Sequence, residues 1–180
     1  AKPAFLAQLL SQEAVDRALV FTRTKHGADK VVKGLARAGI SGDAMHGNKS
    51  QTHRERVLAP FRSGAIRTLV ATYIAARGID VDGISHVVNY DFPMHPEDYV
   101  HRIGRTGRAH AVGDAISFVT PEDHSALHSL ERFIGRGIVR KRSEGFNYSP
   151  AAPAGLPRDH RPPHPLPSEH RSRPPAARPA

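Results

Sequence analysis

The stretch ALVFTRTKHGADKVVKGLARAG, residues 18–39, combines two apolar patterns of different period. Its first four residues form a short apolar run bounded by polar residues, which predicts a buried strand. From Ala28 onward, apolar residues recur at i, i+3, i+4 and i+7 as far as Leu35, and Gly39 follows. This is the pattern of a helix with one buried face and a glycine stop. A strand followed by such a helix predicts the first half of a parallel β–α–β unit.

The same alternation continues toward the carboxyl end of the chain. Apolar runs predict strands at 41–45, 68–71, 86–90 and 115–119, and helical spacing predicts helices at 52–62, from Pro96, and after the start signal at 120–123. Strands that alternate with helices predict an α/β domain with a mainly parallel sheet covered on both faces. Ligands of such sheets bind beyond the carboxyl ends of the strands, so we expect the functional residues directly after the strands.

The composition changes abruptly near Ser149. Residues 150–180 hold ten of the fifteen prolines and five arginines, with Leu156 and Leu166 as the only large apolar residues. Such a segment buries too little surface to offset its ordering entropy, which predicts a folded domain over 1–148 and a disordered tail over 149–180. The net charge of +9 divides into +6 and +3 between them. This excess favours a polyanionic partner, although a basic solvated surface explains the charge equally well.

Composition also excludes several classes of protein. The absence of cysteine excludes disulfides, thiolate zinc sites and cysteine nucleophiles. No apolar run approaches the roughly 18 residues of a membrane span, and no signal peptide opens the chain. We therefore expect a cytoplasmic protein without a membrane partner, and the start at Ala1 suggests a piece of something longer. The twelve histidines are scattered or lie in the tail (His160, His164, His170), so we expect no metal site.

The sharpest segment for chemistry is HRIGRTGR at 101–108. Three arginines at a spacing of three alternate with glycine and threonine, which suits a loop that brings guanidinium and backbone groups together. The guanidinium group is planar, permanently charged and bidentate, so it matches phosphate oxygens. Glycine allows the backbone to approach an anion closely. Alone, the segment predicts a phosphate-binding loop, with a basic loop that has no ligand as the alternative.

At its full length the segment resembles the arginine-finger motif of DEAD-box RNA helicases. Four other segments agree in order and spacing with motifs of that family, over about residues 5–135: VFTRT at 20–24, the HGxxxQxxRxxxxxxFxxG pattern from His46 to Gly64, ATYIAARGID at 71–80, and VNYD at 88–91 with Pro93. Within the family, these segments are most similar to those of the bacterial cold-shock and ribosome-assembly type. The resemblance implies a RecA-like three-layer domain, the second of the two helicase domains. It also implies ATP, with Mg²⁺, bound mainly by the first domain, which this sequence lacks.

The resemblance implies roles for individual residues. Arg105 and Arg108 are expected to reach the γ-phosphate of ATP and to stabilise charge during phosphoryl transfer. Asp80 is expected to bond the ribose, and Gly78 to allow close approach. His101 and Arg102 are expected to couple the arginine loop to the first domain. The RNA sugar–phosphate backbone is expected to contact Thr22, Arg23, Gly47, Gln51, Arg54 and Thr72. Such contacts hold RNA without reading its sequence.

Each of these residues also has an ordinary structural interpretation. Arg23 and Arg54 are explained as surface charges. Thr22 and Thr72 are explained as helix caps, and Gln51 as a partner for a backbone donor in the first turn of a helix. Asp80 is explained by an ion pair with Arg77.

The sequence departs from the family in two respects. Nothing in it matches GxxxxGK[ST] or a DEAD tetrad, so the chain by itself is expected to have no ATPase activity. Tyr73 stands where the family carries Asp. A short acid caps the next helix and pairs with a nearby arginine, whereas a phenol at neutral pH does neither. We therefore expect weaker coupling between the RNA and nucleotide sites, up to a disabled motor.

Three functions remain open. The first is the second half of an ATP-dependent RNA helicase that opens short duplexes, with ribosome-assembly or RNA-decay factors as partners. The second is a non-catalytic RNA-binding remnant, favoured by the missing half and by Tyr73. The third is a domain of a related DNA-translocating helicase, against which the intact HRIGRTGR segment argues.

Overall fold

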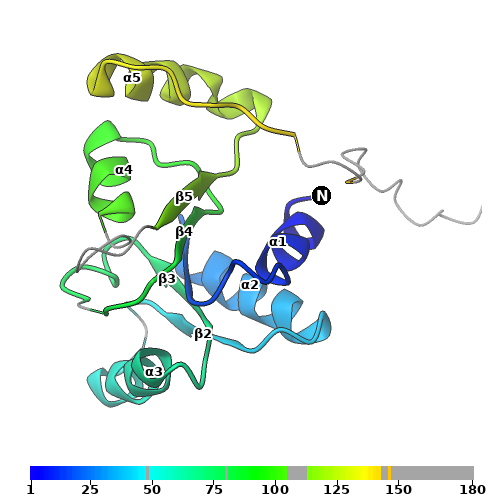
Figure 1. Cartoon of the computed structure of the whole chain (residues 1–180). Coiled ribbons are helices and arrows are strands. Elements are labelled where there is room, and N and C mark those ends of the chain that lie inside the picture. Colours follow the sequence, from blue (N-terminus) through cyan, green and yellow to red (C-terminus); the bar gives the residue numbers. More distant parts are fainter. Residues whose placement is uncertain (48, 80, 105–112, 143–145, 147–180) are drawn as a thin grey trace, which may run out of the picture. The chain divides into compact units, whose positions relative to one another are not determined.

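In the computed structural model, five strands form one sheet that is flanked by helices (Figure 1). The structure describes residues 1–47, 49–79, 81–104, 113–142 and 146, which belong to one compact unit within 1–149. In chain order the elements are α1 (Lys2–Leu10), β1 (Ala18–Thr22), α2 (Lys25–Arg37), β2 (Gly42–Met45), α3 (Gln51–Ser63), β3 (Thr68–Thr72), β4 (His86–Asn89), α4 (Pro96–Ile103), β5 (Asp114–Ser117), a 3₁₀ turn (Pro121–Asp123) and α5 (His124–Ile134).

All the strand pairs are parallel, and the strand order is β2-β3-β1-β4-β5. The central strand β1 therefore lies between β3 and β4. Its last residue, Thr22, pairs with Thr72 at the end of β3, and Phe21 pairs with Asn89 at the end of β4. Parallel pairing brings the carboxyl ends of the strands to one edge of the sheet, as the alternating pattern predicted.

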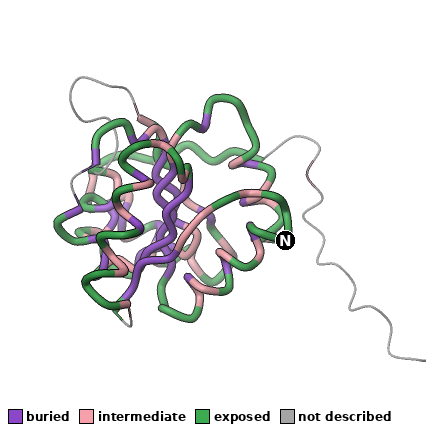
Figure 2. Tube along the Cα trace, turned by 90° about the horizontal axis from the view of Figure 1, so that it is seen from below, coloured by how far each residue is buried: buried purple, intermediate pink, exposed green. Residues whose placement is uncertain are grey.

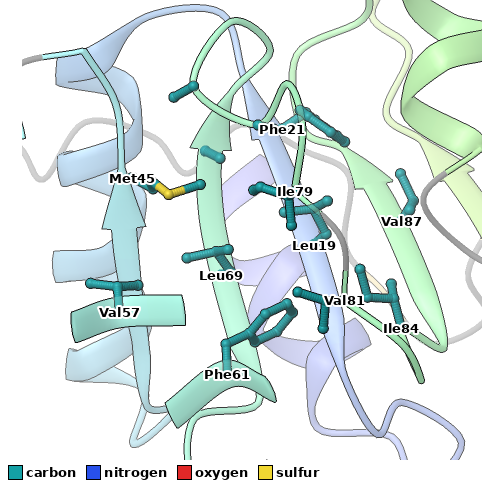
Figure 3. Close-up of a cluster of buried hydrophobic side chains, with 13 residues drawn as sticks. Leu19, Phe21, Met45, Val57, Phe61, Leu69, Ile79, Val81, Ile84 and Val87 are labelled. Carbon is teal, nitrogen blue, oxygen red and sulfur yellow. The ribbon is translucent and has the colours of Figure 1, made fainter. Parts of the chain in front are cut away.

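Successive residues of each strand face opposite sides of the sheet. On one side, the buried side chains of Leu19, Phe21, Met45, Leu69 and Val87 form a cluster with α3 and with the segment after β3. Figure 3 shows Val57 and Phe61 of α3 opposite these strand residues, with Ile79, Val81 and Ile84 completing the cluster. This packing holds α3 and the segment after β3 against the same face of the sheet.

The other side of the sheet is covered by α1 and α2. Val20, Ala44, Val70 and Val88 pack there with Leu6 and Leu9 of α1 and Ala28, Val31 and Leu35 of α2. A third, smaller cluster joins α4 to α5 through Phe92, Tyr99, Leu127 and Leu130. Figure 2 shows the buried residues running through the middle of the described residues, along the strands. The sheet is thus covered on both faces, which confirms the RecA-like three-layer expectation.

Local signals explain where the helices begin and end. Thr24 caps α2 by accepting a hydrogen bond from the Gly27 backbone at 3.0 Å, and Ser50 caps α3 by accepting from His53 at 3.1 Å. Gly64 ends α3 with a left-handed φ of 83°, a conformation that favours glycine. The interpretation of Thr22 as a helix cap is therefore wrong, since Thr24 has that role. The Thr22 hydroxyl instead donates to the Thr24 carbonyl at 3.2 Å.

Candidate functional site

The predicted RNA-contacting residues gather at the carboxyl edge of the sheet. Thr22 and Thr72 lie side by side at the ends of β1 and β3. Gly47 follows β2, the neighbour of β3, and is exposed, with open space where a side chain would stand. Gln51 begins α3, which starts four residues later. The fold therefore brings together residues that are up to 50 positions apart in the chain.

The loop after β1 is tied to the loop after β4. The backbone N–H of Arg23 donates to Asp91 Oδ2 at 2.8 Å, and its guanidinium group donates to the Phe92 carbonyl at 3.4 Å. Lys2 of α1 contacts the other oxygen of Asp91 at 3.6 Å. Arg23 nevertheless remains exposed, so its position is set by these contacts while its charge stays accessible.

Arg54 joins α3 to the loop after β3. Its guanidinium group donates to the carbonyl of Ala75 at 3.0 Å, three residues beyond Thr72. Arg54 is therefore more than an isolated surface charge, because it fixes the spacing between two predicted RNA-contacting segments. Gln51 is exposed, and among the described residues its amide donates one long contact, of 3.5 Å, to Glu55. Most of the hydrogen-bonding capacity of Gln51 is therefore not used within this part of the chain.

His46 anchors the loop that carries Gly47. Its ring is buried, and Nε2 lies 3.0 and 3.1 Å from the two carboxylate oxygens of Asp29 in α2. Lys49 contacts the same carboxylate at 3.7 Å. Burial alone would raise the pKa of Asp29, but the hydrogen bond and charge of His46, with Lys49 and Lys33, outweigh burial and hold that pKa below its ordinary value. The carboxylate therefore stabilises the folded domain in its ionised form.

Replacement of Asp29 by asparagine is expected to lower the free energy of unfolding at pH 7 by about 0.5–1 kcal/mol, the range of a half-exposed ion pair. The folded pKa lies below the ordinary 3.8, so the contribution of Asp29 is present above that pH and disappears as the pH falls through the folded pKa. The parent chain should therefore lose more stability than Asp29→Asn on acidification. Urea unfolding at several pH values measures this difference. The exposed Asp82→Asn serves as the control, and equal acid sensitivity of Asp29→Asn and the parent chain would contradict the assignment.

Arg102 is the buried charged residue of the site, and only 6% of its surface is exposed. One guanidinium nitrogen donates to Asn89 Oδ1 at 3.2 Å and to the Asp91 carbonyl at 3.4 Å. The guanidinium carbon lies 5.1 Å from the ring centre of Phe21 and 5.5 Å from that of Tyr73, which are cation–π distances. Burial lowers the pKa of Arg102, but the group remains charged because its ordinary pKa is so high. The buried Nε has no hydrogen-bond partner among the described residues.

Tyr73 contacts both residues that were expected to couple the two helicase domains. Its ring lies over Arg102, and its hydroxyl lies 2.7 Å from Nδ1 of His101. The sequence predicts that a phenol does not pair with a nearby arginine as a short acid does. In the structure, the contact of Tyr73 with Arg102 is made by the ring face and not by a charged group. The further expectation, weaker coupling between RNA and nucleotide sites, stays a prediction.

A cavity of about 240 Å³ opens beside Tyr73, and it is lined by Phe21, Tyr73, Ala76, Arg77, Gly78 and His101. Gly78 has a left-handed φ of 75°, and open space surrounds the place where its side chain would stand. A rigid ligand can therefore approach the backbone there. The cavity also brings the predicted nucleotide residue Gly78 to the same site as His101.

Several predicted features lie outside the described residues: Asp80, Arg105, Arg108, the segment 149–180 and the tail histidines. Within the described ranges, no group of three histidine or acidic side chains is arranged to hold a metal ion. In the same part of the chain, no helix has both the length and the apolar character needed to cross a membrane.

Sequence reasoning missed the residues that position the site. Asn89 and Asp91 hold Arg102 and Arg23, and Asp29 holds His46. The VNYD motif was the available signal for the first two. The local sequence gives no indication of the role of Asp29, because its position in the helical pattern predicts an ordinary exposed residue of α2.

Comparisons with known proteins agree with this geometry. The family described as "Helicase conserved C-terminal domain" matches residues 1–110. The DEAD-box ATP-dependent RNA helicase CshA of Geobacillus kaustophilus is 47% identical over 137 residues, which are 76% of this chain and 29% of that protein. The chain thus spans less than a third of that curated relative.

Two solved structures share the fold. E. coli DEAD-box protein SrmB, bound to regulator of ribonuclease activity A, has a TM-score of 0.74 and 39% identity, over 76% of this chain and 81% of that chain. S. cerevisiae Dbp5, bound to RNA and ADP BeF3, has a TM-score of 0.70 and 34% identity, over 74% of this chain and 36% of that chain.

Proposed function

The chain belongs to the helicase conserved C-terminal domain family, in its DEAD-box RNA helicase branch, and on this premise we propose that it is the second RecA-like half of an ATP-dependent RNA helicase. The observation that carries the proposal is the sheet edge at which Thr22, Gly47 and Thr72 meet, with His101 and Arg102 directly beside Tyr73. One surface thereby combines the proposed RNA-backbone site with the start of the arginine-rich segment.

RNA is held through its sugar–phosphate backbone. The Thr72 hydroxyl, the open Gly47 backbone and the side chains of Arg23 and Arg54 offer hydroxyl, N–H and guanidinium donors to phosphate oxygens. Thr22 is buried and its hydroxyl already donates to the Thr24 carbonyl, so it shapes this edge without offering a donor. These donors touch no base edge, so binding is tolerant of sequence and sensitive to salt. The contacts of Arg23 with the β4 loop and of Arg54 with Ala75 keep the spacing of these donors fixed.

ATP, with its Mg²⁺, is the substrate that the two helicase domains share. The open backbone at Gly78 suits a close approach by ribose or phosphate, and Asp80 is the proposed ribose partner. Arg105 and Arg108 stabilise negative charge on the transferred phosphoryl group. The family resemblance assigns the Mg²⁺ ion mainly to the first domain.

The proposal extends to the domain organisation and setting of the chain. Residues 1–148 form the helicase domain, and the Pro/Arg-rich segment 149–180 is a basic tether that raises the local concentration of RNA. The enzyme acts in the cytoplasm on short RNA duplexes, together with ribosome-assembly or RNA-decay factors.

RNA-stimulated ATP hydrolysis tests the proposal, with this chain joined to an intact first domain from a close relative. The joined protein is expected to hydrolyse ATP in response to RNA, and the 180-residue chain alone is expected not to. Tyr73→Asp should increase the RNA stimulation, by about three- to tenfold, because a carboxylate forms a stronger, charge-assisted contact with Arg102 than a phenol does. Steady-state ATPase rates with and without RNA measure both effects.

The other outcomes are equally informative. ATP hydrolysis by the Tyr73→Asp form alone would favour the non-catalytic RNA-binding remnant. Equal stimulation by RNA and single-stranded DNA would favour a DNA-translocating relative. Inactivity of both forms would contradict the assignment of the arginine segment.

A further inference from the structure

The Tyr73 side chain contacts His101, Arg102 and the buried cluster that contains Phe21. Its hydroxyl lies 2.7 Å from His101 Nδ1, and its ring is nearly parallel to the imidazole, with an interplanar angle of 8°. The guanidinium carbon of Arg102 lies over the face of the Tyr73 ring, 5.5 Å from the ring centre. The ring also packs against the cluster that contains Phe21. The ring and the hydroxyl of Tyr73 are thus both held in place.

We propose that Tyr73 is a positioning residue that fixes both the ring plane and the tautomer of His101. The phenol hydroxyl donates its proton to Nδ1, so that the neutral imidazole carries its own proton on Nε2. His101 itself is exposed, and an exposed imidazole without such a partner samples several rotamers and both tautomers.

The direction of the hydrogen bond follows from the chemistry of the two groups. A neutral imidazole has one acceptor nitrogen and one donor nitrogen, and the contact occupies Nδ1. A phenol hydroxyl is a better donor than acceptor, because its oxygen lone pair is conjugated with the ring. A separation of 2.7 Å is typical of a hydroxyl donor. Nε2–H therefore remains available as a donor to a group outside this hydrogen bond.

Arg102 makes this arrangement rigid. The guanidinium group is held by Asn89 and Asp91 and lies over both Tyr73 and Phe21. The phenol ring cannot rotate away without losing the cation–π contact, so the hydroxyl stays aimed at His101. A carboxylate at position 73 would reach the same neighbours through charge, whereas Tyr73 reaches them through one neutral hydrogen bond and one ring face. The consequence for ATP turnover rests on the proposed function, while the orientation of His101 does not.

The tautomer is measured directly in the 180-residue chain. A long-range proton–nitrogen NMR spectrum at mildly alkaline pH, where imidazole is neutral, distinguishes a protonated from an unprotonated ring nitrogen. The signals of His101 are identified by their loss in His101→Gln. We expect unprotonated Nδ1 and protonated Nε2 in the parent chain, and averaged signals in Tyr73→Phe. The control Tyr90→Phe, on the opposite face of the sheet, should leave His101 unchanged.

A protonated Nδ1 in the parent chain, or an unchanged spectrum in Tyr73→Phe, would overturn the proposal. In the chain joined to a first domain, Tyr73→Phe should lower the RNA-stimulated kcat by about three- to tenfold, the loss of one hydrogen bond, with the KM for ATP changed by less than about twofold. An unchanged kcat would overturn the role in turnover. If the joined protein never hydrolyses ATP, the proposed function fails, and the spectrum still decides the positioning of His101.

Discussion

Replacement of Arg108 by alanine is expected to lower RNA-stimulated ATP hydrolysis by about 10³-fold or more, as is replacement of Arg105, in the chain joined to a first helicase domain. An arginine that contacts the transferred phosphoryl group neutralises charge that develops only in the transition state. The loss should therefore appear in kcat, while the KM for ATP changes little. Steady-state kinetics at saturating RNA give both quantities.

Two further variants make this experiment specific. Arg108→Lys keeps the positive charge but loses the planar, bidentate group, so it should recover only part of the activity. Arg37→Ala removes an exposed arginine from the last turn of α2, away from the sheet edge, and should leave the rate within about twofold, as expected for a surface position. If Arg105→Ala and Arg108→Ala both keep full activity, the proposal that this segment reaches ATP is wrong.

The sequence predicted the layered fold because its two periodicities were clear. The apolar run at 18–21 and the spacing from Ala28 to Leu35 correspond to β1 and α2. The apolar run at 18–21 did not show on which face of the sheet each of its residues lies. Leu19 and Phe21 pack beneath α3, and Val20 packs beneath α1 and α2, a division that depends on the pairing of the whole sheet.

Elements whose limits are set by tertiary contacts were predicted less well. The strand expected at 115–119 is β5 at Asp114–Ser117, because pairing with β4 decides its ends. Helix α1 was not predicted at all. It has no side-chain cap, and the burial of Leu6 and Leu9 against α2 and the sheet stabilises it. The spacing of Leu6, Leu9 and Leu10 at i, i+3 and i+4, with Pro3 near the start, was the available local signal for this short helix.

The candidate site shows the same limit. The resemblance selected Thr22, Gly47 and Thr72, and the rule that ligands bind at the carboxyl ends of parallel strands predicted that such residues lie at one edge. The partners that hold their neighbours come from far away in the chain: Asp91 binds the Arg23 backbone across 68 residues. No periodicity encodes a side-chain hydrogen bond of that kind, and the pairing of Tyr73 with His101 and Arg102 required the folded geometry.

Replacement of Arg102 by alanine is expected to lower the free energy of unfolding by about 2–4 kcal/mol. The change opens a cavity beside Phe21 and Tyr73, and it leaves Asn89 Oδ1 and the Asp91 carbonyl without their donor. The loss is limited because the buried charge is itself costly, as its lowered pKa and its Nε without a partner indicate. Urea unfolding of the 180-residue chain measures the change.

Arg102→Met separates the two causes of this loss. Methionine fills much of the volume and contacts both rings, but it offers no donor, so we expect a smaller loss of about 1–2 kcal/mol. The difference between the alanine and methionine variants then measures the cavity. The difference between methionine and the parent chain measures the net value of the buried charge. The exposed Arg77→Ala, which should change stability by less than about 0.5 kcal/mol, is the control. If Arg102→Met is more stable than the parent chain, the buried guanidinium group costs the fold more than its contacts return, and its place beside His101 is explained by function alone.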